Sequence, residues 1–229
     1  MVIPQPTSLT PARERCLPVD EAFAGVLPDA GLQRGRVVGC TGPAAMSLAL
    51  ALASRSVIVG SWLAVVGVPT LGVEATAEFG IPLSRLVVVD VQGGPPVWAE
   101  RVAAAADGFD VVLTCPPAGA ERVVRKVRSR LQARGVVMIV VASVKPNVSC
   151  DLEFATTSIA WGGLGQGFGH LASRRVTVQA GGRRLPRPVE LDLWLPAPDG
   201  RITPVAVSYT HMTLPTKESR CCGRGSPGD

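Results

Sequence analysis

The sequence predicts an α/β fold, in which a mostly parallel sheet is covered by helices and ends in a terminal antiparallel hairpin. Composition is the first observation behind this prediction. Of the 229 residues 47% are hydrophobic and only 4% are aromatic, and runs rich in Val and Ala are typical of buried parallel strands and their covering helices. The second observation is that short apolar runs alternate with longer Ala-rich or Arg-rich runs, which favours β-α-β units with right-handed crossovers.

The expected parallel strands are short apolar runs, and the expected helices lie between them. The strands occupy residues 36–40, 62–66, 86–91, 110–114 and 136–142. The helices occupy residues 43–54, 73–79, 97–106 and 119–134. The first helix has Pro43 in its first turn, and the second ends before Gly80, a usual helix-ending residue.

Beyond residue 145 the pattern changes. Residues 175–179 and 189–195 alternate apolar and polar side chains with period two, which predicts an antiparallel pair joined through residues 181–184. Glycines at positions 162, 163, 165, 167 and 169 predict a flexible loop before that pair.

We expect one folded domain over residues 21–206. Residues 1–20 are Pro-rich and are expected to form a loosely ordered N-terminal segment. Residues 207–229 break in composition and resemble translated sequencing-adapter DNA, so we expect a non-native tail there. The strongest membrane-like stretch, residues 57–73, has no charge but is interrupted by Gly and Pro, and the Pro-rich N-terminus lacks the apolar segment of a signal peptide. We therefore expect a cytoplasmic protein without a membrane segment.

The cysteines give no sign of a metal centre. Six are present, but they form no C-x-x-C pair and no His is placed to complete a zinc site. We therefore expect no metal site and no cofactor.

The junction of the first strand and the first helix lies where a nucleotide-binding fold has its phosphate loop. A working loop follows G-x-x-x-x-G-K-[ST], in which backbone N–H groups and the Lys bind phosphates and the hydroxyl binds Mg²⁺. Here Ala44 and Met46 replace the second Gly and the Lys. The residues of the degenerate loop that could still contact a phosphate are Gly39, Thr41, Gly42 and Ser47. We expect a structural turn; the alternative is phosphate binding through backbone N–H groups alone.

Carboxylates are also missing where a RecA-type ATPase would need them. Such an enzyme has a catalytic acid just after its second strand and a metal-linked Asp at the end of a later one. Residues 65–69 and 111–115 contain no acid, and Asp110 stands at the wrong end of its strand. Since phosphoryl transfer depends on positioning and on charge neutralisation by Lys and Mg²⁺, we expect no ATPase activity and no enzyme.

An ordered set of runs resembles the RecA-like proteins called ImuA, above all their actinobacterial branch. The runs are Leu-Gln-Arg-Gly-Arg-Val-Val at 32–38, Trp-Leu-Ala-Val-Val-Gly at 62–67, Gly-Ile-Pro-Leu-Ser-Arg-Leu at 80–86, Trp-Gly-Gly-Leu-Gly at 161–165 and Leu-Trp-Leu-Pro at 193–196. The similarity spans residues 20 to 206.

The resemblance implies a RecA-like fold and an accessory factor of translesion synthesis that is induced by DNA damage in the SOS response. Its partners would be an ImuB-like relative of the Y-family polymerases and an error-prone replicative-type polymerase in the same complex. Two alternatives stay open: an ATP-binding RecA-fold regulator and a SulA-type cell-division inhibitor.

Two basic clusters are candidate contact surfaces on a chain whose net charge is +5. In the helix predicted over residues 119–134, the candidate DNA contacts are Arg122, Arg125, Lys126, Arg128 and Arg130. A solvated outer face is the alternative. Single-stranded DNA is a further candidate ligand, although the aromatic residues that favour such binding are missing there.

The second cluster surrounds the predicted hairpin. Its candidate partner-binding residues are Trp161, Arg174, Arg175, Arg183, Arg184, Arg187 and Trp194. Trp and Arg dominate protein interfaces, whereas edge-strand arginines can also serve only to discourage aggregation. The ImuA resemblance implies partner binding in this C-terminal region.

Overall fold

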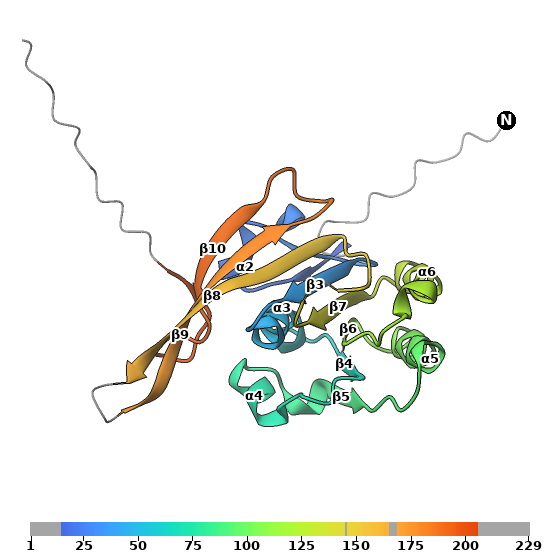
Figure 1. The fold of residues 1–229 in the computed structure, drawn as a ribbon, viewed down its shortest axis with the longest axis horizontal. Helices are drawn as coiled ribbons and strands as arrows, with labels where there is room; N and C mark the ends of the chain where they lie inside the picture. The colour runs from blue at the N-terminus through green and yellow to red at the C-terminus, as the bar shows by residue number, and fades with distance from the viewer. Residues whose placement is uncertain (1–14, 145, 165–168, 206–229) are drawn as a thin grey trace, which may run out of the picture.

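The computed structural model describes residues 15–144, 146–164 and 169–205 (Figure 1). Within these ranges a nine-stranded sheet has the strand order β11-β10-β9-β8-β3-β7-β6-β4-β5, and β1 and β2 form a separate two-stranded sheet. The structure is therefore α/β, with a mostly parallel central sheet and additional antiparallel strands.

The parallel part of the sheet consists of β3 (Val37–Thr41), β4 (Leu63–Val66), β5 (Leu86–Val89), β6 (Val111–Thr114) and β7 (Val137–Ala142). All five strands predicted from the sequence are confirmed, with ends that differ by one or two residues. β3 lies between β7 and β8, so the loop that leaves its carboxyl end is in the middle of the sheet. In open α/β sheets this edge is where ligands usually bind.

Helices cover both faces of the parallel part (Figure 1). On one face are α3 (Ala45–Ile58) and α4 (Val73–Glu78), together with the short α2 (Glu21–Ala24). On the other are α5 (Pro95–Ala105) and α6 (Val124–Arg134). Successive side chains of a strand point to opposite faces of the sheet. Val65 therefore packs in the hydrophobic core under α3, and Val66 packs in the core under α5 and α6.

Short 3₁₀ helices complete the connections: η1 (Pro28–Ala30), η2 (Leu83–Arg85) and η3 (Ala120–Arg122). The helix predicted over residues 119–134 is therefore divided into η3 and α6. Gly119 adopts a left-handed conformation with φ of 83°, and the first hydrogen bonds after it span three residues, from Val123 N to Ala120 O. The regular α-helix begins only at Val124.

The antiparallel part begins with β8 (Leu152–Leu164), which is parallel to β3 and antiparallel to β9 (Gly169–Gly181). β10 (Val189–Trp194) pairs with β9 and with β11 (Thr203–Pro204), both antiparallel. The predicted pairing of residues 175–179 with 189–195 is confirmed, with Arg175 opposite Trp194. Figure 1 shows the far part of the β8–β9 hairpin extending away from the helices.

The flexible loop predicted at the glycine cluster is wrong for the described glycines. Gly162 and Gly163 belong to β8 and Gly169 to β9, while residues 165–168 lie outside the described residues. The reason is that the β8–β9 ladder continues through them. A bulge between Gly162 and Leu164 brings the chain so close that a Cβ on Gly163 would lie 2.3 Å from the carbonyl oxygen of His170.

Part of the N-terminal segment is packed on the core. β1 (Cys16–Pro18) pairs with β2 (Gly31–Gln33), Leu17 is buried, and Phe23 meets Phe154 edge-on with ring centroids 6.5 Å apart. Residues 15–20 are thus ordered strand and cap. Residues 1–14 and the expected tail, 207–229, lie outside the described residues.

Candidate functional site

The loop between β3 and α3 is closed by a side chain from β8. The hydroxyl of Thr156 accepts a hydrogen bond from the backbone N–H of Ala44 at 3.2 Å and donates one to the carbonyl oxygen of Thr41 at 3.0 Å. Thr156 and Ala44 are both buried. A protein hydroxyl therefore takes the backbone donor that a phosphate loop would turn toward its ligand.

The two glycines of this loop make close contacts within the protein. A Cβ on Gly42, whose φ is 89°, would lie 2.3 Å from the carbonyl oxygen of Thr156. A Cβ on Gly39, within β3, would lie 2.9 Å from the sulfur of Cys150. Both glycines are thus required by packing, independently of any ligand.

Few groups in the loop could bind an anion. Pro43 has no N–H, and the N–H of Ala45 donates to Gly42 O at 3.1 Å. Ser47 lies half-buried in the first turn of α3, and residues 39–47 include no Lys or Arg. Two open depressions of about 550 and 620 Å³ lie at the other end of α3, beside Arg55. The loop forms a strand-to-helix turn whose backbone donors at Ala44 and Ala45 bond within the protein.

A neutral network occupies the carboxyl end of β6, where an ATPase would carry its metal-linked Asp. The buried Thr114 hydroxyl accepts a hydrogen bond from the indole N–H of Trp98 at 2.8 Å and donates to Val66 O at 2.7 Å. Asp110 lies at the amino end of β6, as its sequence position predicts, and pairs with Arg34 at 3.0 Å. Neither arrangement provides a carboxylate at the edge where the β3–α3 loop lies.

Three basic residues of α6 are held by carboxylates of the same chain. Arg130 and Arg134 both contact Asp107, whose pKa is lowered mainly by the hydrogen bond from Arg130. Arg128 contacts Asp151 at 2.6 Å. Among the described residues, Arg122, Arg125 and Lys126 form no ion pair and are exposed. The five candidate DNA contacts therefore divide into two that are ion-paired and three that are free to contact a ligand.

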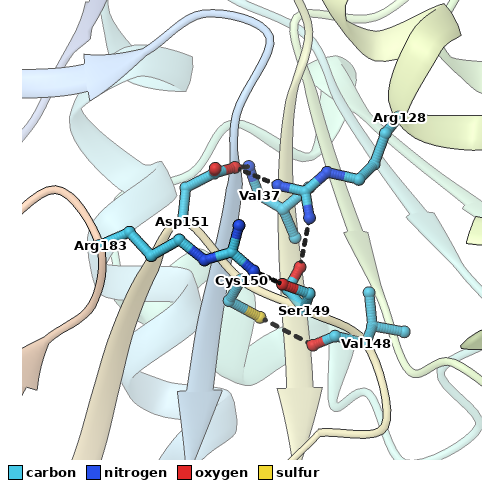
Figure 2. A network of polar contacts seen from close by, with 7 residues as sticks. All are labelled: Val37, Arg128, Val148, Ser149, Cys150, Asp151 and Arg183. Atoms are coloured by element: carbon cyan, nitrogen blue, oxygen red, sulfur yellow. Dashed lines mark hydrogen bonds and ion pairs between the residues drawn. The ribbon is translucent and has the colours of Figure 1, made fainter. Parts of the chain in front are cut away.

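Figure 2 shows how Arg128 and Arg183 meet at the segment that leads into β8. Arg128 donates to the backbone oxygen of Ser149 at 2.6 Å and Arg183 to the Ser149 hydroxyl at 2.7 Å. Asp151 also accepts from the backbone N–H of Val37 at 2.9 Å. This network fixes the amino ends of β3 and β8 to α6, and it joins the two basic clusters that are separate in the sequence.

The exposed face of the β8–β9 hairpin carries a stacked Trp and Arg. Trp161 and Arg174 lie opposite each other on β8 and β9, and the guanidinium carbon is 5.1 Å from the centre of the indole ring. Trp161 is 51% exposed. The guanidinium donates to Leu195 O at 2.7 Å, and burial lowers the pKa of Arg174. The pair is a rigid, amphipathic surface feature.

A row of polar side chains crosses β8, β9 and β10. Ser158 donates to Thr177 at 2.8 Å, Thr177 donates to Asp192 at 2.7 Å, and Arg175 forms an ion pair with Asp192. The pKa of Asp192 is lowered, first by the hydrogen bond from Thr177 and then by Arg175. Trp194 is half-buried on β10, opposite Arg175.

The candidate partner-binding residues therefore form two groups. Trp161, Arg174, Arg175 and Trp194 lie along the hairpin and β10. Arg183, Arg184 and Arg187 lie in the β9–β10 connection, and β9 puts about 20 Å of extended strand between Arg175 and the start of that connection. The structure brings Arg183 together with α6 and leaves it distant from the Trp161–Arg174 pair.

Comparison with known proteins gives a family. The model of the MT3502 N-terminal domain matches residues 25–146, more than half of the chain. The chain belongs to the MT3502 N-terminal domain family. It is also 30% identical over 148 residues to the uncharacterized protein Rv3395c of Mycobacterium tuberculosis strain H37Rv, which is 61% of this chain and 71% of that protein.

The MT3502 N-terminal domain match covers the parallel part of the sheet with α3 to α6, and it ends before β8. The degenerate loop and α6 lie inside the match. Thr156 and the Trp161–Arg174 pair lie beyond it.

Sequence reasoning missed Thr156, Ser149 and Asp151, because nothing in the local pattern of residues 146–160 identifies them as partners of distant segments. The described residues also give two negative findings for this MT3502 N-terminal domain protein. Within residues 15–144, 146–164 and 169–205, no group of His, Cys, Asp and Glu side chains could hold a metal ion. In that same part of the chain, no helix combines the length and the apolar character needed to span a bilayer.

Proposed function

We propose that this protein is a non-catalytic, RecA-like accessory subunit of a DNA-damage-induced translesion synthesis complex, and that it binds an ImuB-type partner. The observation that carries the proposal is the closure of the β3–α3 loop by Thr156, because it leaves a nucleotide-type scaffold without a usable phosphate site. A protein of this kind would act by binding and assembly.

The positions of the ImuA-like runs support the RecA-like part of the proposal. Residues 32–38 lead into β3 and residues 62–67 contain β4, so these two runs flank the degenerate loop and α3 in the sequence. Residues 80–86 lead into β5. In the antiparallel part, residues 161–164 of one run belong to β8 and residues 193–194 of another belong to β10, while residue 165 lies outside the described residues.

The groups around the loop support the proposal that the protein is non-catalytic. Phosphoryl transfer needs cations and a metal-bound carboxylate near the γ-phosphate. Here residues 39–47 carry no cation, and Thr114 with Trp98 occupies the end of β6. This also disfavours the alternative of an ATP-binding regulator.

The partner surface that we propose is the Trp161–Arg174 pair on the hairpin. A half-exposed Trp held by a stacked Arg loses little conformational freedom on binding, and both residue types are common at the centres of interfaces. The error-prone replicative-type polymerase would be held in the same complex through the ImuB-type subunit.

Co-purification with an ImuB homologue tests the proposal. The tagged full chain should retain the homologue through a salt wash, and a parallel capture with the division GTPase should retain nothing. Retention of the division GTPase alone would instead support the SulA-type alternative.

Two measurements test the loop. Titration calorimetry with ATP, with and without Mg²⁺, should give no binding heat. The Ser47→Ala variant should support damage-induced mutagenesis as well as the wild type. Magnesium-dependent ATP turnover, or a clear loss of mutagenesis in that variant, would contradict a non-catalytic subunit.

A further inference from the structure

We propose that α6 and the β9–β10 connection together form one binding surface for the phosphodiester backbone of duplex DNA. The two elements are distant in sequence, and the sequence alone predicts two separate clusters with different ligands. In the structure Arg128 of α6 and Arg183 of the connection both bind Ser149 (Figure 2). The surface on either side of Ser149 is therefore continuous.

Unneutralised cations cover this surface. They are Arg122, Arg125, Lys126, Arg183, Arg184 and Arg187, all exposed. In the described part of the chain none of these six forms an ion pair. By contrast, the other basic residues of α6 are neutralised by Asp107 and Asp151. Glu121, next to Arg122, is a neighbouring carboxylate and reduces the local charge by one.

The cations have a spacing that suits a repeating anion. Arg125 and Arg128 of α6 are three residues apart, about 4.5 Å of helical rise, and residues at that interval are neighbours on a helix surface. Arg122 precedes them in η3. Arg128 is held by Asp151, and Arg183 contacts the nearby Ser149, so Arg183 extends the row of cations beyond α6. The guanidinium group also binds phosphate oxygens in a bidentate manner.

The chemistry of the surface favours nucleic acid over a protein partner. Protein interfaces have an apolar centre and a polar rim, whereas DNA interfaces are polar and strongly positive. Neither α6 nor residues 182–188 expose a large apolar side chain, although Val189, just after the connection, is 39% exposed. Aromatic side chains for stacking unpaired bases are also missing from these two elements, so a duplex is favoured over a single strand.

A salt titration of DNA binding tests the inference. The full chain is titrated into a fluorescent duplex of arbitrary sequence, and anisotropy is measured at several salt concentrations. If the six cations each contact a phosphate, the logarithm of the binding constant should fall with the logarithm of salt with a slope of about −5. Two charge-reversal double variants, R125E/K126E and R183E/R184E, should each weaken binding by roughly tenfold or more and reduce the slope by about 2.

The matched control is R55E/R201E, which changes the net charge equally at two exposed arginines, Arg55 near the end of α3 and Arg201 just before β11. This control should bind the duplex almost as the wild type does. If all three double variants weaken DNA binding equally, binding depends only on the net charge of the protein, and the inference is overturned. Preference for single strands would also overturn it.

The result of the DNA titration can be distinguished from the result of the test of the proposed function. In the co-purification with the ImuB homologue, R183E/R184E should still capture the partner. If it loses the partner and the wild type shows no duplex binding, the surface is a protein interface and the inference fails. If duplex binding behaves as expected while the wild type captures no ImuB homologue, the proposed function fails and the inference stands.

Discussion

The Thr156 hydroxyl lies 3.2 Å from the backbone nitrogen of Ala44 and accepts its hydrogen. These residues are 112 positions apart, so a strand from the C-terminal half of the chain closes a loop in the N-terminal half. The same hydroxyl donates to Thr41 O. One side chain thus satisfies the two backbone groups on either side of the turn, and it does so in the place where a nucleotide-binding protein would hold a phosphate.

Replacing this hydroxyl should destabilise the protein without restoring a nucleotide site. Thr156→Val keeps the shape of the side chain but removes its hydrogen bonds to the Ala44 N–H and to Thr41 O, which should cost about 1–3 kcal/mol. Denaturant unfolding measures the change. Thr157→Val is the control, because Thr157 is exposed and its bond to Thr177 O is 3.3 Å long; it should change stability by about 0.5 kcal/mol or less. Equal effects would mean that Thr156 does not close the loop.

The loop should not accept a side chain at Gly42. Gly42→Ala places a methyl group 2.3 Å from Thr156 O in a left-handed backbone conformation, so we expect a loss of at least about 2 kcal/mol, measured by thermal and denaturant unfolding. Gly25→Ala is the control, since nothing lies within 4 Å of the added carbon and φ is −70°. That change should be neutral or slightly stabilising. A stable Gly42→Ala protein would show that the loop can open.

The parallel core could be predicted from the sequence because its signals are local. Each strand is a short continuous apolar run and each flanking helix is a longer run beside it, so both signals are visible in a short window of sequence. β8 could not be predicted in this way, since residues 152–164 mix polar, aromatic and glycine residues without a clear period. What makes them a strand is pairing with β3 and β9.

The candidate site was predicted in part, and the reason is geometric. The degenerate loop is a contiguous motif, and its position after β3 follows from the motif itself. The grouping of the arginines does not, because adjacency in sequence put Arg175 with Arg183, whereas β9 separates them. Arg128 and Arg183 lie 55 positions apart and still meet at Ser149. Only the order of the strands could reveal that contact.

Asp151 should be one of the most important carboxylates for stability. Its side chain is only 12% exposed, and it accepts from both Arg128 and the Val37 N–H. Asp151→Ala leaves a partly buried charge and a backbone donor unpaired, so we expect a loss of about 2–4 kcal/mol in denaturant unfolding. Asp199→Ala removes an exposed pair whose atoms are 3.9 Å apart and should change stability by about 0.5 kcal/mol or less. A small effect of the Asp151 variant would argue against the network as the link between α6 and the sheet.

Asp192 should make the antiparallel part sensitive to acid. Its pKa in the folded protein is lowered by Thr177 and Arg175, so the carboxylate is more favoured in the folded state than in the unfolded chain. The resulting stabilisation is present above the unfolded pKa of roughly 4 and is lost as the pH falls through the lower folded pKa. Unfolding free energies between about pH 5 and pH 3 should therefore fall less steeply in Asp192→Asn than in the wild type. Identical slopes in the wild type and Asp192→Asn would contradict the role given to this carboxylate.

Trp161 should matter for partner capture and little for folding. The side chain is 51% exposed, and its main contact is the Arg174 guanidinium at 5.1 Å, so Trp161→Ala should cost about 1 kcal/mol or less in unfolding experiments. Trp62 provides a matched control, because it is 44% exposed and has Arg85 at 6.0 Å from its ring, but it lies just before β4 on another part of the surface. In quantitative capture of the ImuB homologue, Trp161→Ala should weaken binding by roughly tenfold or more, while Trp62→Ala should bind as the wild type does. Equal losses would indicate an effect on folding, and a loss confined to Trp62→Ala would move the interface to the amino end of β4.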